Sequence, residues 1–383
     1  MAAAVAAPGR TQRYFATVFA ARMASSHALN TYLVWLAFTS RSVATAGWVL
    51  VARASSALIV PVVVGHVHDR GRIGPWLRVC AIVEALGAIT LAWVGWHGAA
   101  AWAMVGISLA LGATSSLFDT AVYPLLLSGT PGRLRPHVMV GLSYDIAKVV
   151  GSSLMLALLA VWHSPWPVMC VSVLSLAGWR LTSSRSTAET VGESESLSTR
   201  SVWSSMPLGP VVALALVAIL PAQVSVFQWA SAHHSFARYG VLGTVFALGA
   251  VTGNLGLQRL RSTHGLTACA YLCTAVSLVV SVWQAEVGFF GYGVAVATYY
   301  QLTRVLVIEA APLERRGRVS AAMTAPTKLV AVAGGALAPH LVQHRGTLYG
   351  VVVAVCVVCA AFARSGRLPN SSRIAAAITS GTS

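Results

Sequence analysis

The stretch WLRVCAIVEALGAITLAWVGW, residues 76–96, is mostly apolar and carries two charged residues, Arg78 and Glu84. About 20 apolar residues in a helix cross the hydrocarbon core of a bilayer, which is about 30 Å thick. Similar runs recur throughout the 383 residues, of which 56% are hydrophobic and only 9% charged. Soluble globular proteins carry about 25% charged residues, and disordered chains are poor in apolar ones. The composition therefore excludes both classes and predicts an all-α polytopic membrane protein.

Apolar segments divide the chain into twelve predicted transmembrane helices. Their approximate bounds are 14–38, 44–66, 76–96, 101–127, 137–161, 165–183, 207–230, 238–258, 266–284, 287–311, 318–342 and 346–364. The stretch SSRSTAETVGESESLSTRS, residues 183–201, is rich in Ser, Thr and Glu and predicts a flexible cytoplasmic linker between two halves. We therefore expect a six-helix half over 1–183, a linker over 184–204, a second six-helix half over 205–364 and a flexible cytoplasmic tail over 365–383.

The two halves resemble each other at an offset of about 185 residues. Gly65–Arg72 corresponds roughly to Gly253–Arg261, and Arg133 corresponds to Arg316. Duplicated halves with a binding site at their interface are typical of secondary transporters. The sequence thus predicts two pseudo-symmetric six-helix bundles.

Basic residues gather in alternate loops. With the amino terminus in the cytoplasm, the outer loops receive only Arg41, Arg238 and Arg345, and all other loop arginines fall inside. Cytoplasmic loops of membrane proteins carry such an excess of Lys and Arg. We therefore expect a multi-pass protein of the cell membrane with both termini in the cytoplasm, and the same placement argues against nucleic-acid binding.

Several charged residues fall well inside the predicted spans. They are Arg22, Arg53, Glu84, Asp119, Asp145, Lys148, Arg304, Glu309 and Lys328. A charge at bilayer depth costs at least about 2.5–3.5 kcal/mol, so such residues face the protein interior or a water-filled cavity and are functional candidates. The alternative for each is a structural ion pair that only holds helices together.

The fifth predicted helix has a polar stripe. Gly141, Asp145, Lys148 and Ser152 recur at helical spacing, so they share one face, which should meet another helix or a cavity instead of lipid. Asp145 and Lys148 can pair on this face, in a static or a switching role. Asp145 is the first candidate for a proton carrier, followed by Asp119 and Glu84, while Lys148, Lys328 and Glu309 are assigned to an ion-pair network.

Other polar and aromatic residues of the spans suggest the lining of a cavity. These candidates are Arg22, Asn30, Tyr123, Gln223, Trp229, Tyr300 and Arg304. Such a lining suits an amphipathic or anionic organic ligand, although any single aromatic residue can equally belong to the core. The sequence shows no metal-ligand spacing, nucleophile–base pair or phosphate-binding loop, so we expect no cofactor and no enzyme.

The segment GHVHDRGR, Gly65–Arg72, resembles the cytoplasmic signature of the major facilitator superfamily, with Gly65, Asp69 and Arg70 matching in place. Nearly the whole chain, about 14–364, resembles the drug and siderophore exporters of this superfamily. The stretches that carry this resemblance are VLVARASSALIVPVVVGHVHDR, LSYDIAKVVGSSL and EAAPLERRGRVSAAMTAPTKLVAVAGGALAPHL.

The resemblance implies roles for the signature and for one carboxylate. Asp69, with Arg70 and Arg72, would lock the outward-facing form at the cytoplasmic end of the eleventh helix. A membrane carboxylate, which we assign to Asp145, would take up a proton during the cycle. In this sequence Gly151-Ser152 replaces the Gly-Pro of the typical antiporter motif, and Asp119 replaces the arginine of the coupling motif.

These observations predict a monomeric, proton-coupled exporter of a small organic or amphipathic compound that works by alternating access. The first alternative is an importer of a small polar or anionic solute, with Arg22 and Arg304 holding the anion. The second alternative is a membrane receptor or assembly protein that moves nothing.

Overall fold

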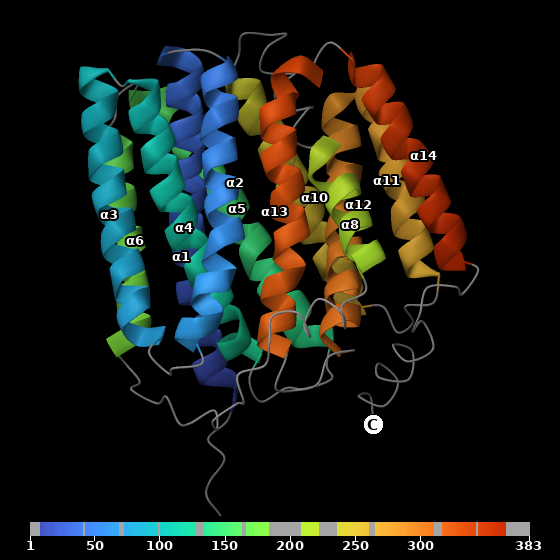
Figure 1. Cartoon of the computed structure of the whole chain (residues 1–383), viewed down its shortest axis with the longest axis horizontal. Coiled ribbons are helices and arrows are strands. Elements are labelled where there is room, and N and C mark those ends of the chain that lie inside the picture. Colours follow the sequence, from blue (N-terminus) through green and yellow to red (C-terminus); the bar gives the residue numbers. More distant parts are fainter. Residues whose placement is uncertain are drawn as a thin grey trace, which may run out of the picture.

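The computed structural model of the chain describes residues 8–40, 43–68, 73–98, 100–127, 134–162, 166–183, 208–221, 236–259, 265–309, 316–341 and 344–364. These residues form twelve helices that stand side by side (Figure 1). The amino-terminal ones are α1 (Pro8–Ser40), α2 (Val43–His68), α3 (Ile73–His97), α4 (Ala101–Leu127), α5 (Leu134–Trp162) and α6 (Trp166–Ser183). The carboxy-terminal ones are α8 (Leu208–Ala218), α10 (Phe236–Arg259), α11 (Leu266–Trp283), α12 (Ala285–Glu309), α13 (Arg316–Leu341) and α14 (Arg345–Arg364).

Each helix corresponds to one predicted span, and the ends differ where hydropathy is a poor guide. The first and fifth spans were predicted from 14 and 137, whereas α1 begins at Pro8 and α5 at Leu134. A helix can continue beyond the hydrocarbon core, and proline suits its first turn, where the backbone N–H has no partner within the helix. The predicted linker, 184–204, and the tail, 365–383, lie outside the described residues.

Helix packing repeats from one half to the other. In the first half α1 packs on α5, α2 on α4, and α3 on α6. In the second half the equivalent pairs are α8 with α13, α10 with α12, and α11 with α14. The halves meet chiefly through α2 with α13 and α5 with α10, which are themselves an equivalent pair of contacts. This arrangement confirms the predicted pseudo-symmetry of two bundles.

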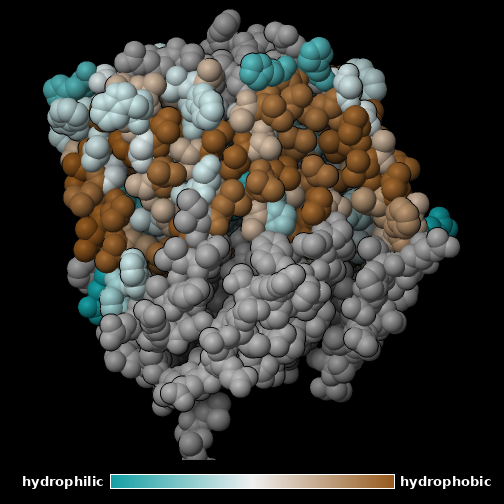
Figure 2. Space-filling model, viewed as in Figure 1, coloured by the Kyte–Doolittle hydropathy of each residue, from teal (hydrophilic) through white to brown (hydrophobic). Residues whose placement is uncertain are grey.

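Apolar side chains cover the outside of the described helices. Figure 2 shows a hydrophobic band over the described part of one face. Large apolar residues such as Leu86, Val150, Leu272 and Val357 are exposed in the structure. Exposed tryptophans lie near helix ends, as on α3 and α6, where the rings of Trp96 and Trp166 meet at 5.0 Å. An apolar band with tryptophan at its edges is the surface expected in a bilayer.

Six of the described helices are both long and apolar enough to cross a membrane by themselves: α3, α4, α5, α10, α11 and α14. The other described helices are more polar, or a shorter length of them is described. The sequence of α13, for example, combines Gly, Ala, Ser and Thr with Lys328. Helices that pack against other helices use small and polar residues in this way.

Candidate functional site

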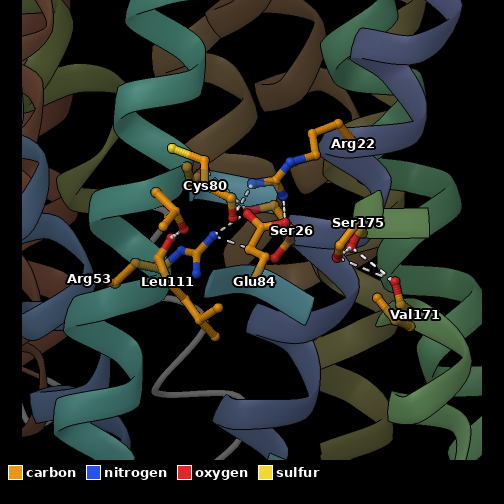
Figure 3. A network of polar contacts seen from close by, with 11 residues as sticks. Arg22, Ser26, Arg53, Cys80, Glu84, Leu111, Val171 and Ser175 are labelled. Carbon is orange, nitrogen blue, oxygen red and sulfur yellow. Dashed lines mark hydrogen bonds and ion pairs between the residues drawn. The ribbon is translucent and has the colours of Figure 1, made fainter. Parts of the chain in front are cut away.

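A buried ion pair joins α1 to α3. Arg22 and Glu84 point toward each other (Figure 3), and their side chains are 0% and 1% exposed. Arg22 also donates a hydrogen bond to the Cys80 carbonyl at 3.4 Å and lies 5.2 Å from the centre of the Phe118 ring. The pair therefore lies inside the amino-terminal half. Neither side chain reaches solvent in this structure, and the roles predicted for them, cavity lining for Arg22 and proton carriage for Glu84, stay predictions.

A second polar network joins α1, α2 and α4. Arg53 donates to Ser26 Oγ at 2.7 Å, and Ser26 Oγ donates to Ser115 Oγ at 3.1 Å. Helices α2 and α4 approach closely here because Gly112 has no side chain: a Cβ at this position would lie 2.5 Å from the carbonyl oxygen of Arg53. Arg53 is thus held beside the middle of α1.

The polar stripe of α5 contacts other helices, as predicted. Gly141 lies against the side-chain amide of Gln301 on α12, and Ser152 accepts a hydrogen bond from Thr31 on α1 at 3.1 Å. The apolar residues Ile146 and Val150 form the exposed side of the helix, at 43% and 49% exposure. The stripe therefore faces the interior of the bundle.

Asp145 forms a hydrogen bond between the two halves. Asn254 Nδ2 of α10 donates to Asp145 Oδ2 at 2.6 Å, and Asn254 is fully buried. Among the described side chains, the expected ion pair between Asp145 and Lys148 is not formed. The Lys148 ammonium lies instead 4.5 Å from the centre of the Phe246 ring on α10. The carboxylate therefore accepts from a neutral amide and the ammonium lies on an aromatic face, while the two charges still act on each other electrostatically.

Cationic side chains gather around His27 of α1. Its ring meets the Tyr144 ring of α5 edge-on at 5.1 Å. Lys148 of α5, Arg53 of α2 and Lys328 of α13 all lie within electrostatic range of His27. The helices α1, α2, α5 and α13 thus each contribute to one cluster at the meeting of the halves, although they are far apart in the sequence.

Sequence reasoning did not place His27 or Arg53 in a site. The sequence marks Arg53 only as one of the charges inside the predicted spans, and a lone histidine in a span more often packs than reacts. Their position within a helix is visible in the sequence, but their common neighbours on other helices are not.

Three other cavity candidates have described side chains: Asn30 on α1, and Tyr300 and Arg304 on α12. Asn30 is one turn from His27 and half-buried, and its Oδ1 is buried without a hydrogen-bond partner among the described residues. Tyr300 and Arg304 are one turn apart on α12, with the guanidinium 5.7 Å from the ring centre. Both are half-buried.

The side chains of several predicted site residues lie outside the part of the chain that the structure describes. Asp119 and Tyr123 belong to α4, Gly65 to α2 and Glu309 to α12, but their side chains lie outside the described part. The remaining signature and cavity candidates also lie outside the described residues: Asp69, Arg70, Arg72, Gln223 and Trp229. Their roles stay predictions.

No protein-family model and no curated protein sequence matches the chain. Many solved structures are similar in fold, and two transporters are among them. The E. coli fucose:proton symporter FucP, solved as a single-residue variant, has a TM-score of 0.65 and 15% identity, over 92% of this chain and 98% of that one. The nucleoside transporter NupG, also solved as a single-residue variant, has a TM-score of 0.63 and 15% identity, over 93% of this chain and 99% of that one.

Neither structure is named as a drug or siderophore exporter, so they do not support the exporter branch that the sequence resembled. At this level of identity the similarity shows the fold alone. The chain is an all-helical membrane protein with the major facilitator fold, built from two pseudo-symmetric six-helix bundles.

Proposed function

We propose that the protein is a secondary active transporter that imports a small polar solute together with protons, by alternating access between its two halves. The fold supports transport, since the two similar structures are named as a fucose:proton symporter and a nucleoside transporter. Symport of a polar solute favours import over the export of an amphipathic drug. The excess of arginine in alternate loops supports a cytoplasmic position for both termini.

The observation that carries proton coupling is the hydrogen bond between Asp145 and Asn254. It joins α5 to α10, one of the main contacts between the halves. A hydrogen bond to a carboxylate is roughly twice as strong as one between neutral groups. Proton uptake by Asp145 would weaken this link and so change the balance between inward-facing and outward-facing forms.

Proteoliposomes with an internal pH dye test this proposal. A panel of sugars, nucleosides and organic acids is added outside, and a transported solute should drive proton entry. The Asp145→Asn variant should lose proton entry and still exchange labelled solute across the membrane, because exchange needs no net proton movement. The matched control is Glu286→Gln, which removes a carboxylate at an exposed position at the start of α12.

The outcomes separate the alternatives. Unchanged proton entry in Asp145→Asn would reject Asp145 as the carrier. In intact cells, import predicts that solute accumulation rises on expression, whereas a fall would restore the exporter interpretation. Solute binding without exchange in the native protein would indicate a receptor.

A further inference from the structure

The cluster around His27 carries an inference about the substrate. In the sequence, the cations well inside the predicted spans are Arg22, Arg53, Lys148, Arg304 and Lys328. The carboxylates inside the spans are Glu84, Asp119, Asp145 and Glu309. Since Arg22 is matched by Glu84, four cations remain for three carboxylates. Even if all three carboxylates are paired, positive charge is in excess within the membrane-spanning part.

Two of these cations are placed close to His27 by contacts of their helices. Arg53 of α2 donates to Ser26 Oγ, next to His27 in α1, and Lys148 is one turn along α5 from Tyr144, whose ring meets the His27 ring at 5.1 Å. Lys328 of α13 also acts electrostatically on His27, and the Asp145 carboxylate acts on Lys148, so the cluster holds one negative charge beside its three cations. The cluster thus draws on both halves, since α13 belongs to the second and the other three helices to the first. A site shared by the halves is where alternating access can change the exposure of a ligand.

The cluster faces the interior of the protein and is not sealed within one bundle. His27, Arg53, Lys148 and Lys328 are each half-buried, in contrast to the fully buried Arg22 and Glu84. Lys148 is two residues from both Ile146 and Val150 on the lipid side of α5. At about 100° per residue it therefore points about 160° away from each of them. Its partial exposure is directed toward the interior of the bundle.

We infer that this cluster is a binding site for a small organic anion, and that the proposed importer carries such an anion as its substrate. Lysine and arginine supply the positive charge, and their attraction for an anion is stronger in a medium of low dielectric than in water. The imidazole of His27 and the amide of Asn30, one turn along α1, supply hydrogen bonds to the polar remainder of the ligand. The anionic group is a carboxylate or a phosphate, since both satisfy the same cations.

This inference rests on the proposed transport function, but binding can be tested without transport. Thermal unfolding of the purified protein in lipid nanodiscs is followed at constant ionic strength with matched pairs of compounds. The pairs are galactose with galacturonate, uridine with uridine monophosphate, and glycerol with succinate. Only the anionic members should raise the melting temperature, and galacturonate against the monophosphate separates a carboxylate site from a phosphate site.

Charge variants assign the effect to the cluster. Lys148→Gln and Lys328→Gln should each weaken the apparent affinity for the anion about tenfold or more, as expected for loss of one charge-assisted contact. Lys148→Arg keeps the charge and should retain binding, which controls for misfolding. Arg364→Gln removes an exposed cation at the end of α14 and should change nothing.

Stabilisation by neutral members as strong as that by anions would overturn the inference, and so would an anion effect unchanged in Lys148→Gln. Absence of any anion effect would overturn it as well. Anion binding without flux in proteoliposomes would retain the site and reject transport. Flux of neutral solutes alone would retain transport and reject the anion site.

Discussion

Replacing Glu84 with glutamine should destabilise the protein strongly, because it removes the counter-charge of a buried guanidinium. Arg22 is 0% exposed and Glu84 1% exposed, so water cannot solvate the charge that is left. The Cys80 carbonyl at 3.4 Å and the Phe118 ring at 5.2 Å remain near Arg22, but neither carries a negative charge. The change therefore removes the carboxylate that the described part of the chain places against this buried guanidinium.

The expected loss is about 3–5 kcal/mol in the free energy of unfolding, the range measured when one partner of a buried ion pair is removed. Arg22→Met alone should cost a similar amount, since it leaves the carboxylate unpaired. The double variant Arg22→Met/Glu84→Leu should recover most of the loss, because well-packed apolar residues of similar volume are often as stable as the ion pair. With Glu84→Leu as the second single variant, these changes form a double-mutant cycle whose coupling energy measures the pair.

Equilibrium denaturation in mixed detergent micelles measures these free energies. Glu286→Gln, an exposed carboxylate on α12, is the control and should change stability by less than about 0.5 kcal/mol. A loss below about 1 kcal/mol for Glu84→Gln, or a double variant no better than the single ones, would refute the structural role of the pair. If Glu84→Gln folds normally yet abolishes proton entry, Glu84 is instead a proton carrier, as the sequence first suggested.

Two further predictions concern the packing of helices. Gly112→Ala should destabilise the protein by about 1–3 kcal/mol, because the new Cβ would lie 2.5 Å from the Arg53 carbonyl oxygen. The control is Gly106→Ala on the same helix. A Cβ at that position has no atom within 4 Å, so the change in stability should be less than about 1 kcal/mol. Denaturation midpoints compare the two, and equal losses would contradict the close approach of α2 and α4. The pair Ser153→Cys/Thr244→Cys should form a disulfide on mild oxidation, since the native hydroxyls are 3.0 Å apart across α5 and α10. A protease site is inserted in the linker and cleaved, and the halves are separated by denaturing gel electrophoresis. They should migrate together only in the double variant and only without reductant. Halves that migrate separately under these conditions would argue against this interface.

Much of the architecture could be predicted from the sequence because membrane helices are marked by local composition. An apolar run such as 76–96 is long enough to span a bilayer whatever its neighbours, and α3 covers it. The stripe of α5 could also be predicted, since helical spacing alone places Asp145 and Lys148 on one face. Helix ends were less predictable, because α1 continues beyond its apolar part to Pro8.

The partners of the charged residues could not be predicted. The sequence suggested that Asp145 pairs with Lys148, less than one turn along the same helix, but Asp145 bonds to Asn254, which is more than a hundred residues away. It suggested a cavity role for Arg22, which the structure pairs with Glu84 inside one bundle. It offered no reason to join His27 to Arg53 and Lys328.

The sequence by itself thus determined that the chain is a membrane protein of two related six-helix halves, and which residues are too polar to face lipid. Hydrophobicity and helical period are local properties, so they need no knowledge of what lies alongside. Only the tertiary structure decided which polar residues meet. The spacing of polar residues along a helix predicts that a side chain points inward. The neighbour that this side chain meets depends on how α1, α2, α5, α10 and α13 pack. That packing is made by contacts between residues that are distant in the chain.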